Sequence, residues 1–159
     1  MIKSSELLSM AKQFFIQIFF QVFVCLSGFF ISQSISINLS PLTFIILSMI
    51  AVSALIGELV ADQQLYKHRE SSSSICTSGL WQYSRHPNYL FDIIFWFSIA
   101  CFSIGTNYFF ISLIGPITLF ATIYFITGPY TERCSVESRG NEYKNYQKSV
   151  PYIFPIKFK

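Results

Sequence analysis

The sequence predicts an all-α membrane protein: a bundle of four transmembrane helices with a cytoplasmic middle loop and a cytoplasmic C-terminal tail. Of its 159 residues, 52% are hydrophobic and 12% are charged, whereas soluble domains carry about 25% charged residues. No Asp, Glu, Lys or Arg lies between Lys12 and Glu58, a gap of 45 residues, or between Asp92 and Glu132, a gap of 39. One crossing takes about 20 residues, so each gap is long enough for two helices.

The boundaries follow from polar breaks inside the two uncharged gaps. The apolar runs are continuous rather than alternating, which disfavours the strands of a membrane barrel. Gly115-Pro116 predicts a kink in the last membrane helix, and Gly128-Pro129 predicts its end. The chain is interpreted as one membrane domain with helices at about 13–31, 41–60, 88–105 and 107–128, a cytoplasmic loop at 61–87 and a tail at 129–159.

The distribution of basic residues predicts the orientation of the bundle. All 11 Lys and Arg fall in the N-terminal segment, the middle loop or the C-terminal tail, and none falls in the two hairpin turns. Basic residues accumulate on the cytoplasmic side of membrane proteins. Both termini are therefore expected to be cytoplasmic. The four cysteines form no CxxC pair, and free thiols are expected.

Residues 79–89, with the sequence GLWQYSRHPNY, gather a cation, an imidazole and an amide at the start of an apolar helix. Pro87 favours a helix start, which would put Arg85 and His86 at the positive end of the helix. Such an end is a natural site for an anion. The alternative is an interfacial belt of Trp and Tyr beside an Arg that reaches to the membrane surface.

Further candidates lie on both sides of this motif. Arg69 follows Asp62 by seven residues, so a continuing helix would bring both to one face, where a guanidinium suits a phosphate. The alternative is a helix end with solvated charges. Asp92 lies about one turn into an apolar helix, a depth at which carboxylates usually face a polar cavity. Tyr143 and Tyr146 share a face if the tail is helical, and the tail also suits binding to anionic lipid.

Taken together, these motifs resemble a known family. Gly79-Leu80-Trp81, residues 83–89, Trp96, Gly128-Pro129, Glu132, Tyr143-x-x-Tyr146-Gln147 and Pro155 resemble the bacterial steroid 5-alpha-reductase-like membrane proteins. That group is related to the isoprenylcysteine carboxyl methyltransferases and phospholipid methyltransferases. The resemblance covers about residues 57–159 and implies a multi-pass protein of the bacterial inner membrane.

The resemblance also implies a cofactor. The steroid reductases hold NADPH with their C-terminal helices and cytoplasmic loops, whereas the methyltransferases use a similar Arg-His-Pro-x-Tyr stretch to hold S-adenosylmethionine. The implied cofactor-binding residues are Asp62, Arg69, Arg85, His86, Asn88, Tyr89, Asp92, Glu132, Tyr143 and Tyr146.

The sequence departs from the family pattern in three ways. Phe91-Asp92 stands where the family has Gly-Glu, and Glu132 is not part of the Glu-Glu pair of many methyltransferases. Full-length relatives carry extra helices before the matched region, and in the steroid reductases these supply the catalytic Glu and Tyr. The chain is therefore interpreted as a truncated or degenerate copy, or as half of an assembly. Tyr124 is the one candidate for the missing catalytic acid.

Three functions stay open at this point. The first is NADPH-dependent reduction of a carbon–carbon double bond in a lipid enone, in which the cofactor supplies the hydride and an acid polarises the carbonyl. The second is methyl transfer from S-adenosylmethionine to a lipid or a lipidated cysteine, which depends on proximity and orientation. The third is a non-catalytic remnant of the fold. The expected partners are membrane lipid, a lipophilic substrate and a chain that supplies missing helices; no nucleic acid and no metal are expected. The chain alone is expected to bind nucleotide and to turn over steroid-like enones slowly or not at all.

Overall fold

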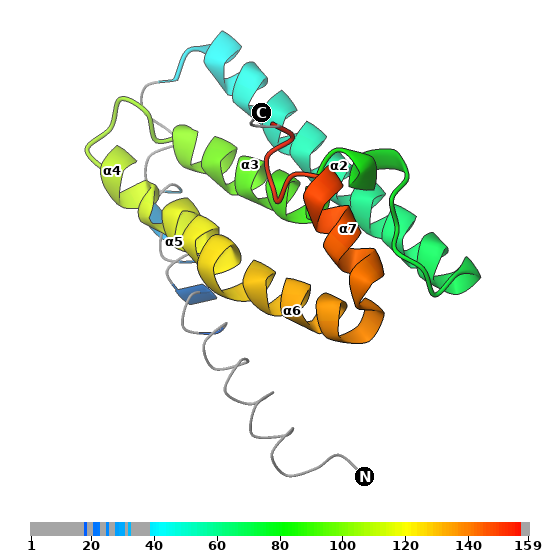
Figure 1. Ribbon diagram of the computed structural model, residues 1–159. Helices are drawn as coiled ribbons and strands as arrows, with labels where there is room; N and C mark the ends of the chain where they lie inside the picture. The colour runs from blue at the N-terminus through cyan, green and yellow to red at the C-terminus, as the bar shows by residue number, and fades with distance from the viewer. Residues whose placement is uncertain are drawn as a thin grey trace.

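The computed structural model (Figure 1) describes residues 39–156, together with Ile18, Gln21, Val22, Cys25, residues 28–30 and Ser32. Within these residues every regular element is a helix, so the predicted all-α class is confirmed for the described part of the chain. The helix predicted at 13–31 falls largely outside the described residues.

The first long helix, α2, spans Pro41–Ser71. Ser40 caps its start, because the Ser40 hydroxyl accepts a hydrogen bond of 3.1 Å from the backbone N–H of Thr43. Pro in the first turn suits a helix start, where its missing N–H costs nothing. The helix ends at Ser71, and the next residue, Ser72, has an extended backbone and donates its N–H to the carbonyl of His68.

The prediction that a loop begins at residue 61 was wrong, because α2 continues for 11 residues beyond position 60. Charged residues begin at Glu58, and they mark where a helix leaves apolar surroundings rather than where its backbone hydrogen bonds end. No Pro or Gly lies between residues 58 and 71, so nothing in this stretch opposes the helix.

The second helix, α3, spans Pro87–Cys101 and runs back alongside α2 (Figure 1). Small residues let the two backbones approach closely. Ala54 and Ala61 of α2 are buried, and a Cβ atom placed on Gly57 would lie 2.6 Å from the ring of Phe91 on α3. Small residues at helix–helix contacts are typical of membrane bundles. This contact holds the second half of α2 against the start of α3.

A second long helical path follows α3. It consists of α4 (Phe109–Ser112), α5 (Ile114–Thr122), the π-helical segment η2 (Ile123–Thr127) and α6 (Gly128–Arg139). The break between α4 and α5 agrees with the kink predicted at Gly115-Pro116. The prediction that Gly128-Pro129 ends the helix was wrong: the wider π turn precedes the proline, which then occupies the first turn of α6, where no N–H is required.

The predicted tail contains a further helix and an ordered return segment. After a reversal at Gly140, whose φ is +57°, α7 spans Asn141–Ser149. Tyr143 and Tyr146 lie on one buried face of α7 and pack against Ile75, which follows α2. The next residues lead back to α3, where Ile153 is 1% exposed and packs with Ile93. The expectation of a shared face for the two tyrosines is confirmed.

Two helical stretches of the described residues are long and apolar enough to cross a membrane, Pro41–Ser71 and Phe109–Arg139. The helix predicted at 88–105 corresponds to α3, which has 15 residues. Large apolar side chains on α2, such as Leu42 and Met49, are 68% and 65% exposed, as expected for a surface in contact with lipid. The described residues thus support a membrane protein with two candidate spans; four spans and cytoplasmic termini stay predictions.

Candidate functional site

A polar cavity of about 330 Å³ lies beside the charged second half of α2. The short 3₁₀ helix η1 (Gly79–Gln82), the start of α3, α6 and α7 complete its walls. Its size lies at the lower end of the range for small-molecule sites. The lining residues are Asp62, Leu65, His68, Arg69, Ser74, Ile75, Cys76, Trp81, Arg85, His86, Asn88, Tyr89, Thr131, Ser135, Arg139, Tyr143 and Tyr146.

The cavity brings together eight of the ten residues that the sequence indicates as cofactor-binding: Asp62, Arg69, Arg85, His86, Asn88, Tyr89, Tyr143 and Tyr146. Asp92 and Glu132 do not line it. Tyr124 lies elsewhere, in a groove formed with residues 147–154 and 156. The sequence reasoning missed His68 and Arg139. A signal in the sequence could have indicated Arg139, because Thr131, Ser135 and Arg139 are spaced four residues apart. This spacing places them on one helical face, but only if the helix continues beyond Pro129.

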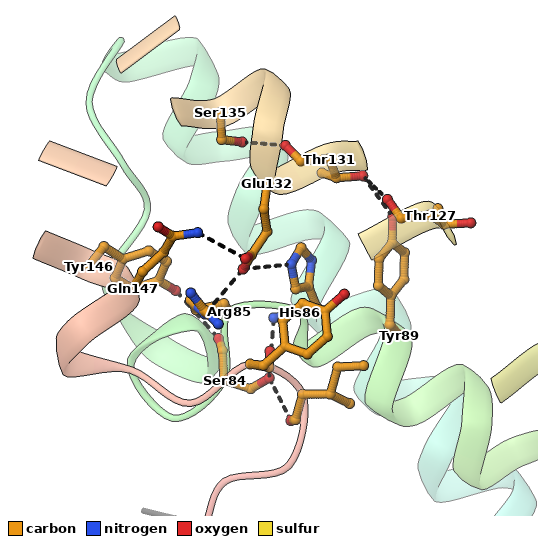
Figure 2. Close-up of polar contacts among 12 residues, drawn as sticks. Ser84, Arg85, His86, Tyr89, Thr127, Thr131, Glu132, Ser135, Tyr146 and Gln147 are labelled. Carbon is orange, nitrogen blue, oxygen red and sulfur yellow. Dashed lines mark hydrogen bonds and ion pairs between the residues drawn. The ribbon is translucent and has the colours of Figure 1, made fainter. Parts of the chain in front are cut away.

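Glu132 does not line the cavity, but it contacts two side chains of the motif, Arg85 and His86, and one of α7, Gln147 (Figure 2). Its carboxylate lies 3.2 Å from Nε of Arg85 and 3.4 Å from Nε2 of His86, and it accepts a hydrogen bond of 2.9 Å from Nε2 of Gln147. The side chains of Arg85 and Glu132 are only 12% and 14% exposed. The charge of Arg85 is therefore largely neutralised within the protein.

A set of hydrogen bonds fixes the loop that carries the motif. The indole of Trp81 donates to the carbonyl of Ala61 at 3.0 Å, which ties η1 to α2. The hydroxyl of Tyr146 donates to the carbonyl of Trp81, and the hydroxyl of Ser84 donates to the carbonyl of Ile153 at 2.7 Å. The backbone N–H of Arg85 donates to the carbonyl of Pro151 at 3.0 Å. The loop is thus held by three other parts of the chain.

One end of the cavity offers hydrogen-bond acceptors. Oδ1 of Asp62 accepts from Nδ2 of Asn88 at 3.0 Å, and the buried Oδ1 of Asn88 has no hydrogen-bond partner in the part of the chain that the structure describes. His86 stacks on Tyr89 with 5.0 Å between the ring centroids and 6° between the planes. The hydroxyl of Tyr89 lies 3.5 Å from that of Thr131 on α6 (Figure 2). An orphaned buried acceptor is costly unless a donor reaches it.

The other end of the cavity carries positive charge. Arg69 belongs to the last turn of α2 and Arg139 to the last turn of α6. Among the described residues, neither guanidinium lies within ion-pair distance of a carboxylate. Arg139 makes a long hydrogen bond of 3.5 Å from Nε to the carbonyl of Ser73. Both cations therefore remain available to a ligand.

Tyr143 gives the site a dependence on alkaline pH. Burial, and then the nearby charge of Glu132, raise the pKa of Tyr143 to about 12 from 10.0. The unfolded chain ionises this phenol near pH 10, so its stabilising contribution is complete below pH 10 and declines as the pH rises towards 12. We expect the melting temperature in detergent to fall between pH 9.5 and 11.5, and to fall less steeply for Tyr143→Phe. Equal slopes for both proteins would contradict this assignment.

Comparisons with known proteins were made over the whole chain. No curated protein and no solved structure matches it significantly. A family model described as "Protein of unknown function (DUF1295)" matches residues 1–150. The match covers most of the 159 residues, and the chain therefore belongs to this family.

Proposed function

We propose that the protein is a membrane reductase that holds NADPH in the polar cavity and reduces a carbon–carbon double bond of a lipid enone. One observation carries the proposal: a single cavity combines the acceptors of Asp62 and Asn88 at one end with two guanidinium groups at the other. Neither guanidinium has a carboxylate partner among the described residues, and the cavity lies at the polar ends of two long apolar helices. A dinucleotide phosphate needs both kinds of group, because its amide and hydroxyl donors lie apart from its phosphates.

The direction of this charge pattern suits a lipid substrate. Arg69 follows Asp62 by seven residues on α2, and Arg139 follows Thr131 by eight on α6. At 1.5 Å of rise per residue, these separations are about 10 and 12 Å along the helices. In both helices the cation lies farther from the apolar segment than the acceptor or hydroxyl does. Phosphates bound by the cations would therefore lie away from the bilayer.

The residues present fit NADPH at the level of their chemistry. Asp62 and the orphaned oxygen of Asn88 would accept hydrogen bonds from ribose hydroxyl or amide groups, and Arg69 would bind a phosphate. NADPH supplies the hydride for such a reduction. The substrate also needs a proton, and the cavity contains a phenolic O–H in Tyr89, at the end nearer to the apolar helices. Tyr89 is thus a better candidate for this role than Tyr124, which does not line the cavity.

Methyl transfer from S-adenosylmethionine to a lipid is the second candidate. The acceptor pair of Asp62 and Asn88 favours it, because a carboxylate suits a ligand that carries positive charge on sulfur and nitrogen. Arg69 and Arg139, which have no carboxylate partner among the described residues, favour NADPH, since S-adenosylmethionine has no phosphate.

Direct binding distinguishes the candidates. We expect the protein purified in detergent to bind NADPH and not S-adenosylmethionine. Arg69→Ala should weaken NADPH binding by about 1.5–3 kcal/mol, the range for a hydrogen bond to a charged group. Arg133→Ala is the matched control, because Arg133 is exposed on α6 and does not line the cavity.

Each other outcome has a definite meaning. Binding of S-adenosylmethionine alone would replace the reductase with the methyltransferase. Binding of neither cofactor would contradict both enzyme proposals and favour the third hypothesis, a protein that keeps the fold without the chemistry. Equal losses for Arg69→Ala and Arg133→Ala would show that the effect comes from net charge rather than from the cavity.

A further inference from the structure

We infer that His68, Arg69 and Arg139 form a subsite for a phosphate monoester, and that this subsite selects a dinucleotide with a 2′-phosphate over one without it. The inference rests on the proposed function and adds to it the residues that determine cofactor specificity. Arg139 and His68 are identified by their place in the cavity lining, because the sequence motifs indicated neither of them.

Arg85 does not belong to this subsite. Arg85 belongs to the motif and lines the cavity, yet its guanidinium pairs with Glu132 at 3.2 Å and is mostly buried. An arginine whose charge is already neutralised contributes less to binding a dianion. Arg69 and Arg139, whose guanidinium groups have no carboxylate partner among the described residues, are the stronger candidates.

Two cations without a carboxylate partner among the described residues, Arg69 and Arg139, line one cavity. A cation in the last turn of a helix is stabilised by the helix dipole, and this accounts for the position of each arginine separately. It does not account for their convergence from α2 and α6 on the same cavity, where like charges repel each other. A bound anion removes that repulsion, so the arrangement favours anion binding.

His68 is held by the serine-rich turn that follows α2. Nε2 of His68 lies 3.0 Å from the carbonyl oxygen of Ser74 and 3.2 Å from its hydroxyl. The hydroxyls of Ser72 and Ser74 are 2.7 Å apart, and the N–H of Ser74 donates to the Ser72 hydroxyl. The serine-rich turn is therefore shaped by its own side chains, and it fixes His68 at the wall of the cavity.

The nearby carboxylate of α7 does not neutralise this end. Oε1 of Glu142 accepts a hydrogen bond of 3.2 Å from the backbone N–H of Ile75 and forms no ion pair with either arginine. A phosphate monoester carries a charge of about −1.5 to −2 at pH 7. Two guanidinium groups that have no carboxylate partner among the described residues, together with the imidazole of His68 in the same lining, match that charge.

The test measures dissociation constants for NADPH and NADH, with Arg139→Gln as the variant and Arg133→Gln as the control on the same helix. We expect the unmodified protein to prefer NADPH by about tenfold or more, as a charge-assisted hydrogen bond would give. Arg139→Gln should remove most of that preference by weakening NADPH alone. Arg139→Lys should restore part of it, and Arg133→Gln should leave it unchanged.

Two outcomes would overturn the subsite. One is equal binding of NADPH and NADH by the unmodified protein. The other is an equal loss of affinity for NADPH and NADH in Arg139→Gln. That result would mean that Arg139 contacts the diphosphate, which the two cofactors share, and not the 2′-phosphate. If neither cofactor binds, the proposed function fails, and inorganic phosphate becomes the probe. Phosphate should then raise the melting temperature of the unmodified protein more than that of Arg139→Gln; equal shifts would exclude the subsite as well.

Discussion

Replacement of Glu132 by Ala is expected to cost about 3–5 kcal/mol of stability, the range for a buried ion pair that loses one partner. The change leaves the guanidinium of Arg85 largely buried without its counter-charge and removes the acceptor of Gln147. The expected measurement is a large fall in the melting temperature of the protein in detergent. Glu137→Ala is the matched control, since Glu137 lies on the same helix and is exposed.

A double variant distinguishes an uncompensated buried charge from a simple loss of packing as the cause of this loss of stability. Replacing both partners together, as Glu132→Leu with Arg85→Met, should recover much of the stability, because apolar residues of similar volume often substitute for a buried ion pair at little cost. A double variant no more stable than Glu132→Ala would contradict the view that an uncompensated charge causes the loss. The double variant is also a test of function, since it keeps Arg69 and Arg139 intact.

Replacement of Gly128 by Val is expected to disrupt the junction of η2 and α6. A Cβ atom at this position would overlap the hydroxyl oxygen of Tyr152 and lie 2.9 Å from the backbone carbonyl oxygen of Ile123. Side chains forced into a packed interior typically cost about 1–3 kcal/mol, and sometimes more; the backbone contact and the branched side chain place Val at the upper end. The measurement is the melting temperature in detergent, which should fall for Gly128→Ala and fall further for Gly128→Val.

A compensating change identifies the contact. Adding Tyr152→Phe to Gly128→Ala removes the closest atom, the hydroxyl oxygen, and should restore part of the lost stability. It cannot restore all of it, because the ring carbon of Tyr152 and the carbonyl of Ile123 stay within 2.8 and 2.9 Å of the added Cβ. If Tyr152→Phe gives no recovery, the strain lies in the backbone of the junction instead.

Much of the cavity could be predicted because its residues occupy short-range patterns. Asp62 and Arg69 are two helical turns apart, so continuation of the helix was enough to place both on one face. Arg85, His86, Asn88 and Tyr89 are consecutive or nearly so in one motif, and Tyr143 and Tyr146 share a helical face. Local spacing determines such arrangements without knowledge of the tertiary structure.

The errors arose where tertiary contacts compete with local signals. Gly128-Pro129 usually ends a helix, yet here a π turn comes before it and Tyr152 packs against Gly128. The missed end of α6 also concealed Arg139. Glu132 is a different case: its role as a cofactor ligand stays a prediction, and the structure pairs it with Arg85 and His86 and leaves it out of the cavity lining. No pattern in one sequence distinguishes a carboxylate that faces a ligand from one that orients its neighbours.

The return of residues 150–156 to the motif loop affects how the site is made during synthesis. Ser84 is held by Ile153, 69 residues later in the chain, and Arg85 by Pro151. While translation has not yet reached those residues, the two long helices can already enter the bilayer, but the motif loop lacks its anchors. Contacts of such high sequence separation form slowly, because a long loop must close first. Ligand binding is therefore expected to be acquired last, after membrane insertion, in a maturation step that involves the final portion of the described chain.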